Sequence, residues 1–392
     1  MESSLVDNYK YTRTTTTTVP SKNSVFRAEV DLFSDAEWDE IVAGFSDAVI
    51  YQTSSFGALR WGKEKLSRIA IYEGGEIVAA AQVAILSAPL LGAGIAHCKF
   101  GPLWRPRNRP VRVEFYREIL RALRAEYAQS RGLLLRLKPW EMDDSAEMCR
   151  RHRQLSQLKP QSHLPKYNTF VVTMNRSMEE LHGGLSRRWR SNLRKAQKNS
   201  AIHVTRSSSE KAAAVFMQLH NEMRALKTFV DTSEAECLPR LVAGLPEQLR
   251  PAIFTAYMGG KPVSSLAVSA IGETAFYLYA ASGRDGRNAN ASYLLFWEAL
   301  QWVKERNCRW LDLVGSMPKG TGGYQGYRQF KKAFTGSNGS EQHMCDWEVS
   351  GSWRSSLVVH GGTFISERWR ASLHALNGLR VKFSRYPGGT RG

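Results

Sequence analysis

The sequence predicts a mixed α/β protein built from two copies of one unit. Three observations carry this prediction: the length of 392 residues, the apolar fraction of 43%, and an order of elements that repeats in the two halves. A chain of this length exceeds the size at which one hydrophobic core stops growing, so two domains are expected. The apolar fraction, which includes 10% aromatic residues, is sufficient to fill two cores.

The repeat begins with two strands joined by a pair of glycines. One copy has an extended stretch, Gly74-Gly75 and an apolar run over 77–86, and the other has Gly259-Gly260 followed by 263–271. Two consecutive glycines can both take positive φ, which a tight hairpin turn requires. The sequence therefore predicts a β-hairpin at corresponding places in the two halves.

The same order of elements continues after each hairpin. A third strand, an amphipathic helix and a short apolar strand follow in both copies, as the spacing of their apolar residues indicates. The expected ranges are 97–103, 111–130 and 133–137 in the first half and 275–281, 292–306 and 310–314 in the second. Chance similarity between two α/β halves is the alternative, but five elements in one order favour duplication.

A polar stretch between 158 and 166 marks the boundary between the copies. The predicted organisation is a disordered tail over 1–25, a first domain over 26–165, a second domain over 166–350 and a basic amphipathic tail over 351–392. We expect a cytoplasmic protein, because the N-terminal residues have no apolar signal region and no apolar run approaches the roughly 20 residues that span a bilayer. The five scattered cysteines indicate reduced thiols and no metal site.

The formal net charge is +18 at pH 7, and part of it is concentrated in one short segment. Such an excess attracts phosphates, nucleic acid or an anionic membrane face, although a solvated basic surface is the alternative. Between 185 and 198 four cations share one face of a predicted helix, namely Arg187, Arg190, Arg194 and Lys198. No acidic residue accompanies them, which favours binding of an anion.

A second segment of interest follows the strand over 310–314. It is rich in glycine from Gly322 onward and ends in Phe330 and Lys331, where a cation beside an aromatic ring could stabilise an oxyanion or bind phosphate. Asp312, on the strand itself, is either a buried acid that orients a nucleophile or a hydrogen-bonding residue at the strand end, and we favour the second interpretation. A pyrophosphate loop would be expected near 287–292, but Asn290 and Ser292 stand where glycines belong, and Ser292 suits a helix N-cap.

These segments resemble the FemABX family of aminoacyl-tRNA-dependent peptidyltransferases and their CelD/BioF-like relatives in the GNAT acyltransferase superfamily. The resemblance runs from about Phe45 to Trp347. Its motifs are Tyr51 to Arg60, Gly101-Pro102, Arg190 to Ala196, Tyr277 to Ser282 with Asn288 to Trp297, Trp310 to Gly315, and Tyr327 to Phe334.

The resemblance implies two tandem GNAT-like domains with a substrate channel between them. It implies that Arg60 and either Arg190 or Arg194 bind the diphosphate of a cell-wall precursor. Phe330 and Lys331 would lie at the transfer centre, where a substrate amine attacks the ester carbonyl of an aminoacyl-tRNA. Tyr279 and Tyr327 would also contact substrate. We therefore expect Arg190, Arg194 and Lys331 to converge at one cleft.

Two alternatives remain open at this stage. The first is an N-acyltransferase of polysaccharide or lipid biosynthesis whose donor is acyl-CoA or an acyl carrier, and the second is a non-catalytic, basic RNA-binding protein. In each enzymatic interpretation the donor, tRNA or CoA, is a substrate, and no bound cofactor is expected. The amphipathic stretch 364–383 either packs on the second domain or contacts a membrane as a peripheral helix.

Overall fold

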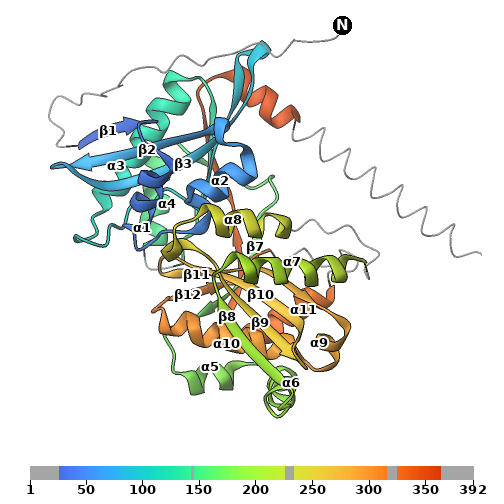
Figure 1. Ribbon diagram of the computed structural model, residues 1–392. Helices are drawn as coiled ribbons and strands as arrows, with labels where there is room; N and C mark the ends of the chain where they lie inside the picture. The colour runs from blue at the N-terminus through green and yellow to red at the C-terminus, as the bar shows by residue number, and fades with distance from the viewer. Residues whose placement is uncertain (1–25, 143–144, 226–233, 316–324, 363–392) are drawn as a thin grey trace, which may run out of the picture.

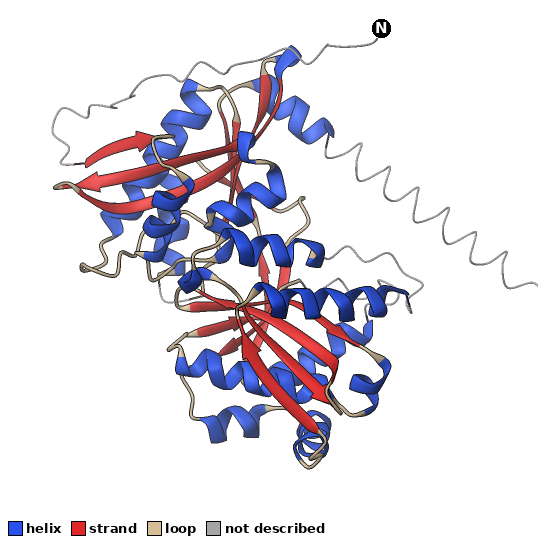
Figure 2. Ribbon diagram, viewed as in Figure 1, coloured by secondary structure: helices blue, strands red, loops and turns tan. Residues whose placement is uncertain are grey.

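The computed structural model describes residues 26–142, 145–225, 234–315 and 325–362. These residues form two α/β units, one above the other in Figure 1, and each unit has a twisted sheet flanked by helices (Figure 2). The strand orders are β1-β2-β3-β4-β5-β14-β6 in the first sheet and β13-β7-β12-β11-β10-β9-β8 in the second. The predicted α/β fold with two GNAT-like units is confirmed.

The strands are short except in the two central hairpins. The first unit contains β1 (Phe26–Val30), β2 (Leu66–Glu73), β3 (Glu76–Ala88), β4 (Ala93–Lys99), β5 (Leu134–Lys138), β6 (Lys159–Gln161) and β14 (Asp346–Ser350). The second contains β7 (Tyr167–Thr173), β8 (Ile202–Ser207), β9 (Ala252–Met258), β10 (Lys261–Ala270), β11 (Thr274–Ser282), β12 (Trp310–Asp312) and β13 (Gly339–Met344).

Helices cover both sheets. In the first unit they are α1 (Asp35–Ala43), α2 (Ser54–Trp61), α3 (Val113–Leu123), continued by a π-helical stretch over Arg124–Ser130, and α4 (Ala146–Leu155). In the second they are α5 (Met178–Gly184), α6 (Arg187–Gln197), α7 (Glu210–Ala225), α8 (Leu238–Gly244), α9 (Arg284–Asn288), α10 (Ala291–Glu305) and α11 (Gln325–Thr335). A further helix over 353–362 follows β14. No helix within the described ranges has the length and apolar content needed to cross a bilayer.

The predicted duplication is confirmed by the topology. The series β2-β3-β4-α3-β5 matches β9-β10-β11-α10-β12, with antiparallel hairpins followed by a parallel pair in each unit. The glycine pairs occupy the hairpin turns as expected, with φ of 60° and 88° at Gly74 and Gly75 and of 54° and 75° at Gly259 and Gly260. A Cβ at these values of φ would be strained, which explains the two glycines in each turn.

The two units exchange their last strands, and this corrects the predicted boundary at 350. β7 follows β6 in the chain but lies between β12 and β13 of the second sheet, whereas β14 follows β13 but lies between β5 and β6 of the first. The chain therefore returns to the first unit after Met344. Trp347 of β14 is buried in the first core, so burial of this side chain favours the exchange.

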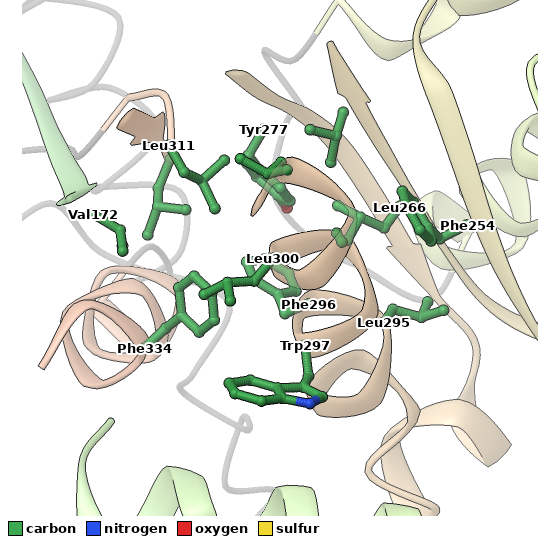
Figure 3. Close-up of a cluster of buried hydrophobic side chains, with 14 of the residues drawn as sticks. Val172, Phe254, Leu266, Tyr277, Leu295, Phe296, Trp297, Leu300, Leu311 and Phe334 are labelled. Atoms are coloured by element: carbon green, nitrogen blue, oxygen red, sulfur yellow. The ribbon is translucent and has the colours of Figure 1, made fainter. Parts of the chain in front are cut away.

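Each unit has its own core, and a third apolar cluster lies between them. In the second unit the core packs α10 and α11 onto the sheet, with Phe296, Leu300 and Phe334 in contact range of β-strand residues (Figure 3). The cluster between the units joins Tyr51 and Phe100 of the first to Phe276 and Leu278 of the second. Because apolar burial of this kind is strongly favourable, it fixes the two units against each other at this junction.

The predicted tails lie mostly beyond the described residues. The expected disordered segment 1–25 and the amphipathic stretch 364–383 both fall outside the described ranges, as does the glycine-rich part of 322–324. Residues 353–362 are the described part of the predicted C-terminal tail. This helix packs on the first unit, because Ser355 is buried and its hydroxyl donates a hydrogen bond to the carbonyl of Gly132 at 2.7 Å.

Candidate functional site

The candidate site lies where β11 and β12 separate, at the end of the second unit that faces the first (Figure 1). The parallel pairing stops at Phe276 and Asp312, after three residue pairs, while β11 continues to Ser282. The register of β11 against β10 also shifts here and leaves Leu278 as an extra residue. Bulges and separating strands free backbone groups for a ligand, so this is a favourable place for chemistry.

The chain leaves β12 through an unusual turn. Val314 and Gly315 both have positive φ, of 46° and 55°. The left-handed region is unfavourable for a β-branched residue, and such strain is typical of functional sites. The amide of Val314 donates a hydrogen bond to the Asp312 carboxylate at 2.7 Å, which holds the turn. The turn directs the carbonyls of Val314 and Gly315 toward α11.

Lys331 of α11 occupies the space beside this turn and is only 1% exposed. Its ammonium donates hydrogen bonds to the carbonyl of Gly315, at 3.1 Å, and to that of Val314. The nitrogen also lies 4.1 Å from the ring centre of Tyr327 and 5.2 Å from that of Tyr277. Burial lowers the pKa of Lys331 to about 7, since charge is disfavoured away from water.

Asp312 is fully buried and accepts four hydrogen bonds. Its donors are Trp140 Nε1 at 2.7 Å, Thr169 Oγ1 at 2.5 Å, Tyr167 Oη at 3.2 Å and the backbone amide of Val314. Burial raises the pKa of this carboxyl, while the donors act in the opposite direction. Because its oxygens are occupied, Asp312 is suited to hold the site together, in agreement with its interpretation as a strand-end hydrogen-bonding residue.

The first unit contributes a second lysine that the sequence analysis missed. Lys99 ends β4, and its Nζ lies 4.1 Å from the ring centre of Tyr51. Burial lowers the pKa of Lys99 to about 8. The negative charge of the Asp312 carboxylate opposes this shift. Its signal in the sequence is a lysine directly before Phe100-Gly101-Pro102, at the end of a buried strand. Two amines with lowered pKa values thus lie near one buried carboxylate.

Arg60 and Tyr279 lie together at the same junction. Arg60 forms an ion pair with Glu234. The pKa of the Tyr279 hydroxyl is raised mainly by burial; the Glu234 charge raises it further, and the Arg60 charge lowers it. The negative charge of the Glu234 carboxylate also favours higher pKa values for Lys99 and Tyr51. The structure therefore brings Arg60, Tyr279 and Lys99 into one neighbourhood, with Arg60 already neutralised by Glu234.

A small cavity of roughly 50 Å³ opens at the same seam and is lined in part by Trp140. Its walls combine aromatic rings with charged groups from both units, including Trp140, Trp310, Arg105, Asp47, Glu141 and Glu273. Burial raises the pKa of Asp47 to about 6, although its carboxylate accepts backbone hydrogen bonds from Trp104 at 2.9 Å and Arg105 at 3.2 Å. Trp140 is shared, since its indole nitrogen contacts Asp312 while its ring lines the cavity.

The basic helix forms as predicted and packs on α11, the helix that carries Lys331. α6 lies at the opposite end of the second unit from the junction (Figure 1). It packs through Trp189 against Phe330 and Phe334 of α11, whereas Arg190 donates hydrogen bonds to the carbonyls of Leu185, at 2.6 Å, and Gly183. Among the described residues no contact joins Arg190 or Arg194 to Lys331, so their convergence at one cleft stays a prediction.

Arg190 has a local structural role that can be tested. Its guanidinium satisfies carbonyls at the C-terminal end of α5, so Arg190→Ala should lower the free energy of unfolding by about 1 kcal/mol. Arg194 on the same helix is exposed, and Arg194→Ala should change it by less than about 0.5 kcal/mol. Urea unfolding of both variants measures the difference. Equal effects would show that the contacts of Arg190 contribute nothing.

Two further expectations are revised by the geometry. Phe330 packs against Tyr293 and Phe296 as well as Trp189, so it fixes α11 on the core. The N-cap of α10 is Asn290, with φ of 59°, and not Ser292 as predicted. The hydroxyl of Ser292 instead lies 2.8 Å from that of Ser282. The short helix α9 and the left-handed Asn290 thus occupy the place where a pyrophosphate loop was sought.

Comparison with known proteins supports this description. Residues 183–332, which include α6, the β11–β12 region and Lys331, match the acetyltransferase (GNAT) domain family. The crystal structure of FemX is similar, with a TM-score of 0.67 and 15% identity over 84% of this chain and 98% of FemX. The C-terminal domain of an Agrobacterium fabrum protein assigned as a lysylphosphatidylglycerol synthetase has a TM-score of 0.52 and 14% identity, with coverage of 83% and 96%. Comparison with curated protein sequences found no match.

These comparisons confirm the predicted resemblance at the level of the fold. The chain has the FemX fold, and its second unit carries a GNAT acetyltransferase domain, so the prediction of an acyltransferase is confirmed. Lys331 lies inside the matched domain.

Proposed function

We propose that this chain, with the FemX fold and a GNAT domain, transfers an aminoacyl group from charged tRNA to an amine of a cell-envelope precursor. The observation that carries this proposal is Lys331, a buried amine beside the separated ends of β11 and β12. The amine of the acceptor attacks the ester carbonyl carbon, an amide bond forms, and the ester bond to the tRNA ribose breaks. The amine proton leaves with the ribose oxygen.

Lys331 would stabilise the negative charge that develops on the carbonyl oxygen. An ammonium has three N–H donors, and two of them are taken by the carbonyls of Val314 and Gly315, so one remains for substrate. A donor fixed in a site with little water is effective because it needs no reorganisation during the reaction. The pKa near 7 also allows Lys331 to give a proton to the leaving oxygen at neutral pH.

The region near α10 supports a donor other than CoA. A backbone loop that binds pyrophosphate needs open amide groups and small residues. Here Gly286 of α9 packs so closely on β10 that an added Cβ would lie 2.2 Å from the Val263 carbonyl oxygen. The hydroxyls of Ser264, Ser282 and Ser292 form one hydrogen-bonded group beside it. Both features lie beside residues 287–292, where the sequence analysis looked for a pyrophosphate loop, and they support a donor other than CoA.

The exposed face of α6 supports a large polyanionic donor. Five of its cations are exposed, namely Arg187, Arg188, Arg194, Lys195 and Lys198. Within the described parts of the chain, no carboxylate forms a salt bridge with any of them. A helix face of this kind, away from the transfer centre but on the same unit, fits a nucleic-acid backbone better than a small diphosphate.

Transfer assays with alternative donors test the proposal. Purified protein is incubated with a nucleotide-linked peptidoglycan precursor and either tRNA charged with radiolabelled amino acids or radiolabelled acyl-CoA. Label on the precursor from tRNA alone is the expected result. Transfer from acyl-CoA alone would replace the proposal with an N-acyltransferase. Tight RNA binding without transfer from either donor would assign a binding function.

Neutralising the exposed face of α6 should weaken tRNA binding. We expect Arg187→Ala/Arg194→Ala/Lys198→Ala to reduce the slope of log K against log salt by about 2, because each lost phosphate contact removes about 0.7–0.9. Filter binding over a range of salt concentrations measures this slope. The matched control is Arg117→Ala/Arg121→Ala/Arg124→Ala, which removes the same charge from the first unit. Equal loss in both variants would mean that only net charge matters.

A further inference from the structure

The β3–β4 turn and the helix over 353–362 lie at the end of the first unit that is farthest from the second (Figure 1), and both carry exposed apolar side chains. Three of them belong to the β3–β4 hairpin and two to the helix over 353–362. They are Leu86 (36% exposed), Leu90 (103%), Leu91 (55%), Trp353 (72%) and Leu357 (67%). We call these five side chains the apolar tip. Soluble surfaces commonly carry isolated apolar residues, but several large exposed ones on two adjoining elements indicate an interaction site.

The hairpin projects beyond the sheet to which it belongs. β3 pairs with β2 only as far as Ala84, and β4 begins to pair with β5 at Ile95. In the described pairing, Ile85 to Ala88 of β3 pair only with β4, and Ala93 and Gly94 of β4 pair only with β3. Leu90 and Leu91 therefore stand on a protrusion, and full exposure of Leu90 means that no described neighbour covers it.

The helix over 353–362 is fixed beside this hairpin by a buried serine. Ser355 is 0% exposed, and its hydroxyl accepts a hydrogen bond from the amide of Gly94 at 3.2 Å while it donates one to the carbonyl of Gly132. Trp353 and Leu357 are one helical turn apart, on the face opposite Ser355. The helix thus adjoins the hairpin at Gly94, and both elements carry exposed apolar side chains.

Positive charge accompanies the apolar tip. Arg354 is exposed, and its guanidinium carbon lies 5.8 Å from the ring centre of Trp353. Outside the described residues, the sequence after Gly362 contains one acidic residue, Glu367, and the cations Arg368, Arg370, Arg380, Lys382, Arg385 and Arg391. Apolar side chains combined with cations are the composition that binds the surface of an anionic bilayer.

We propose that the apolar tip inserts into the surface of an anionic phospholipid bilayer and holds this protein at the membrane. The shape favours this occupant over a second copy of the chain, because a narrow projecting hairpin enters a bilayer easily but offers little flat area to a folded partner. Trp353 is suited to the interface, where its ring is buried and its indole N–H stays hydrated. The proposal is independent of the donor and acceptor discussed above.

Vesicle cosedimentation of the full chain tests the proposal. The vesicles contain phosphatidylcholine alone or with about one-third phosphatidylglycerol. We expect Leu90→Ser/Leu91→Ser to raise the lipid concentration for half-maximal binding to anionic vesicles about tenfold. The matched control is Leu32→Ser/Val111→Ser. It also replaces two exposed aliphatic side chains with serine, since Leu32 is 58% and Val111 is 49% exposed. Val111 adjoins Arg112, which pairs with Glu73 at the end of β2, opposite the first residue of β3 and so far from the β3–β4 turn.

The outcomes separate insertion from the alternatives. Binding to anionic vesicles that the hairpin variant weakens and the control does not would support insertion. Absence of binding to anionic vesicles would overturn it, as would equal binding of both variants, which would mean that charge alone acts. A concentration-dependent dimer of the wild type, lost in the hairpin variant, would assign the apolar tip to a second copy instead. Circular dichroism verifies that both variants are folded.

Discussion

Replacing Lys331 with alanine should lower turnover by about 10²–10³-fold while KM changes much less. A loss of this size is typical when one fixed donor to a developing oxyanion is removed. Lys331 is suited to that role because its ammonium is held by the carbonyls of Val314 and Gly315 beside the separated strands. Initial rates of amino-acid transfer from charged tRNA, measured over a range of acceptor concentrations, separate the two parameters.

The neighbouring lysine provides the control for this prediction. Lys332 is exposed on the same helix, so Lys332→Ala removes the same charge without reaching the site, and its turnover should stay within about twofold of wild type. If Lys331→Ala instead raises KM and leaves turnover intact, Lys331 binds substrate and takes no part in the chemical step. Equal rates in both variants would remove Lys331 from the reaction.

Replacing Asp312 with alanine should produce the largest loss of stability. The carboxylate accepts hydrogen bonds from Trp140, Tyr167, Thr169 and the amide of Val314, and it is fully buried. Its removal leaves several buried donors without an acceptor, at about 1–3 kcal/mol for each. We expect the free energy of unfolding to fall by at least about 3 kcal/mol, as measured by chemical denaturation.

An exposed aspartate shows whether this effect depends on burial. Asp285 lies on the surface at the start of α9, so Asp285→Ala should cost less than about 1 kcal/mol. A loss for Asp312→Ala no larger than that of Asp285→Ala would mean that the hydrogen bonds to Asp312 do not organise the site. In that case the positive φ of Val314 must be maintained by other contacts.

The architecture of each unit was predictable because its signals are local. Paired glycines with positive φ mark the hairpins at Gly74 and Gly259, and the period of apolar residues marks α3 and α10. The exchange of β7 and β14 was not predictable. A strand such as Asp346–Ser350 has the same local pattern in either sheet, and only long-range pairing with β5 and β6 decides where it lies.

The site shows the same division between local and long-range signals. Lys331 was predicted from the motif over 327–334, but its pKa is lowered by burial, and its neighbours include Tyr277, which lies far away in the sequence. Lys99 was missed because a lysine at a strand end is usually exposed. The hydrogen bonds of the Arg190 guanidinium to the carbonyls of the preceding helix were not predictable, because a charged helix face does not reveal such contacts.

A buried amine with a pKa near 7 is the central feature of the site, and the pH dependence of stability tests it directly. Lys331→Met removes this amine, so the difference in unfolding free energy between wild type and variant isolates its titration. Between about pH 7 and pH 10 the unfolded chain binds one more proton than the folded one, so wild type should gain about 1.4 kcal/mol per pH unit relative to the variant. A difference that stays constant over this range would contradict the account.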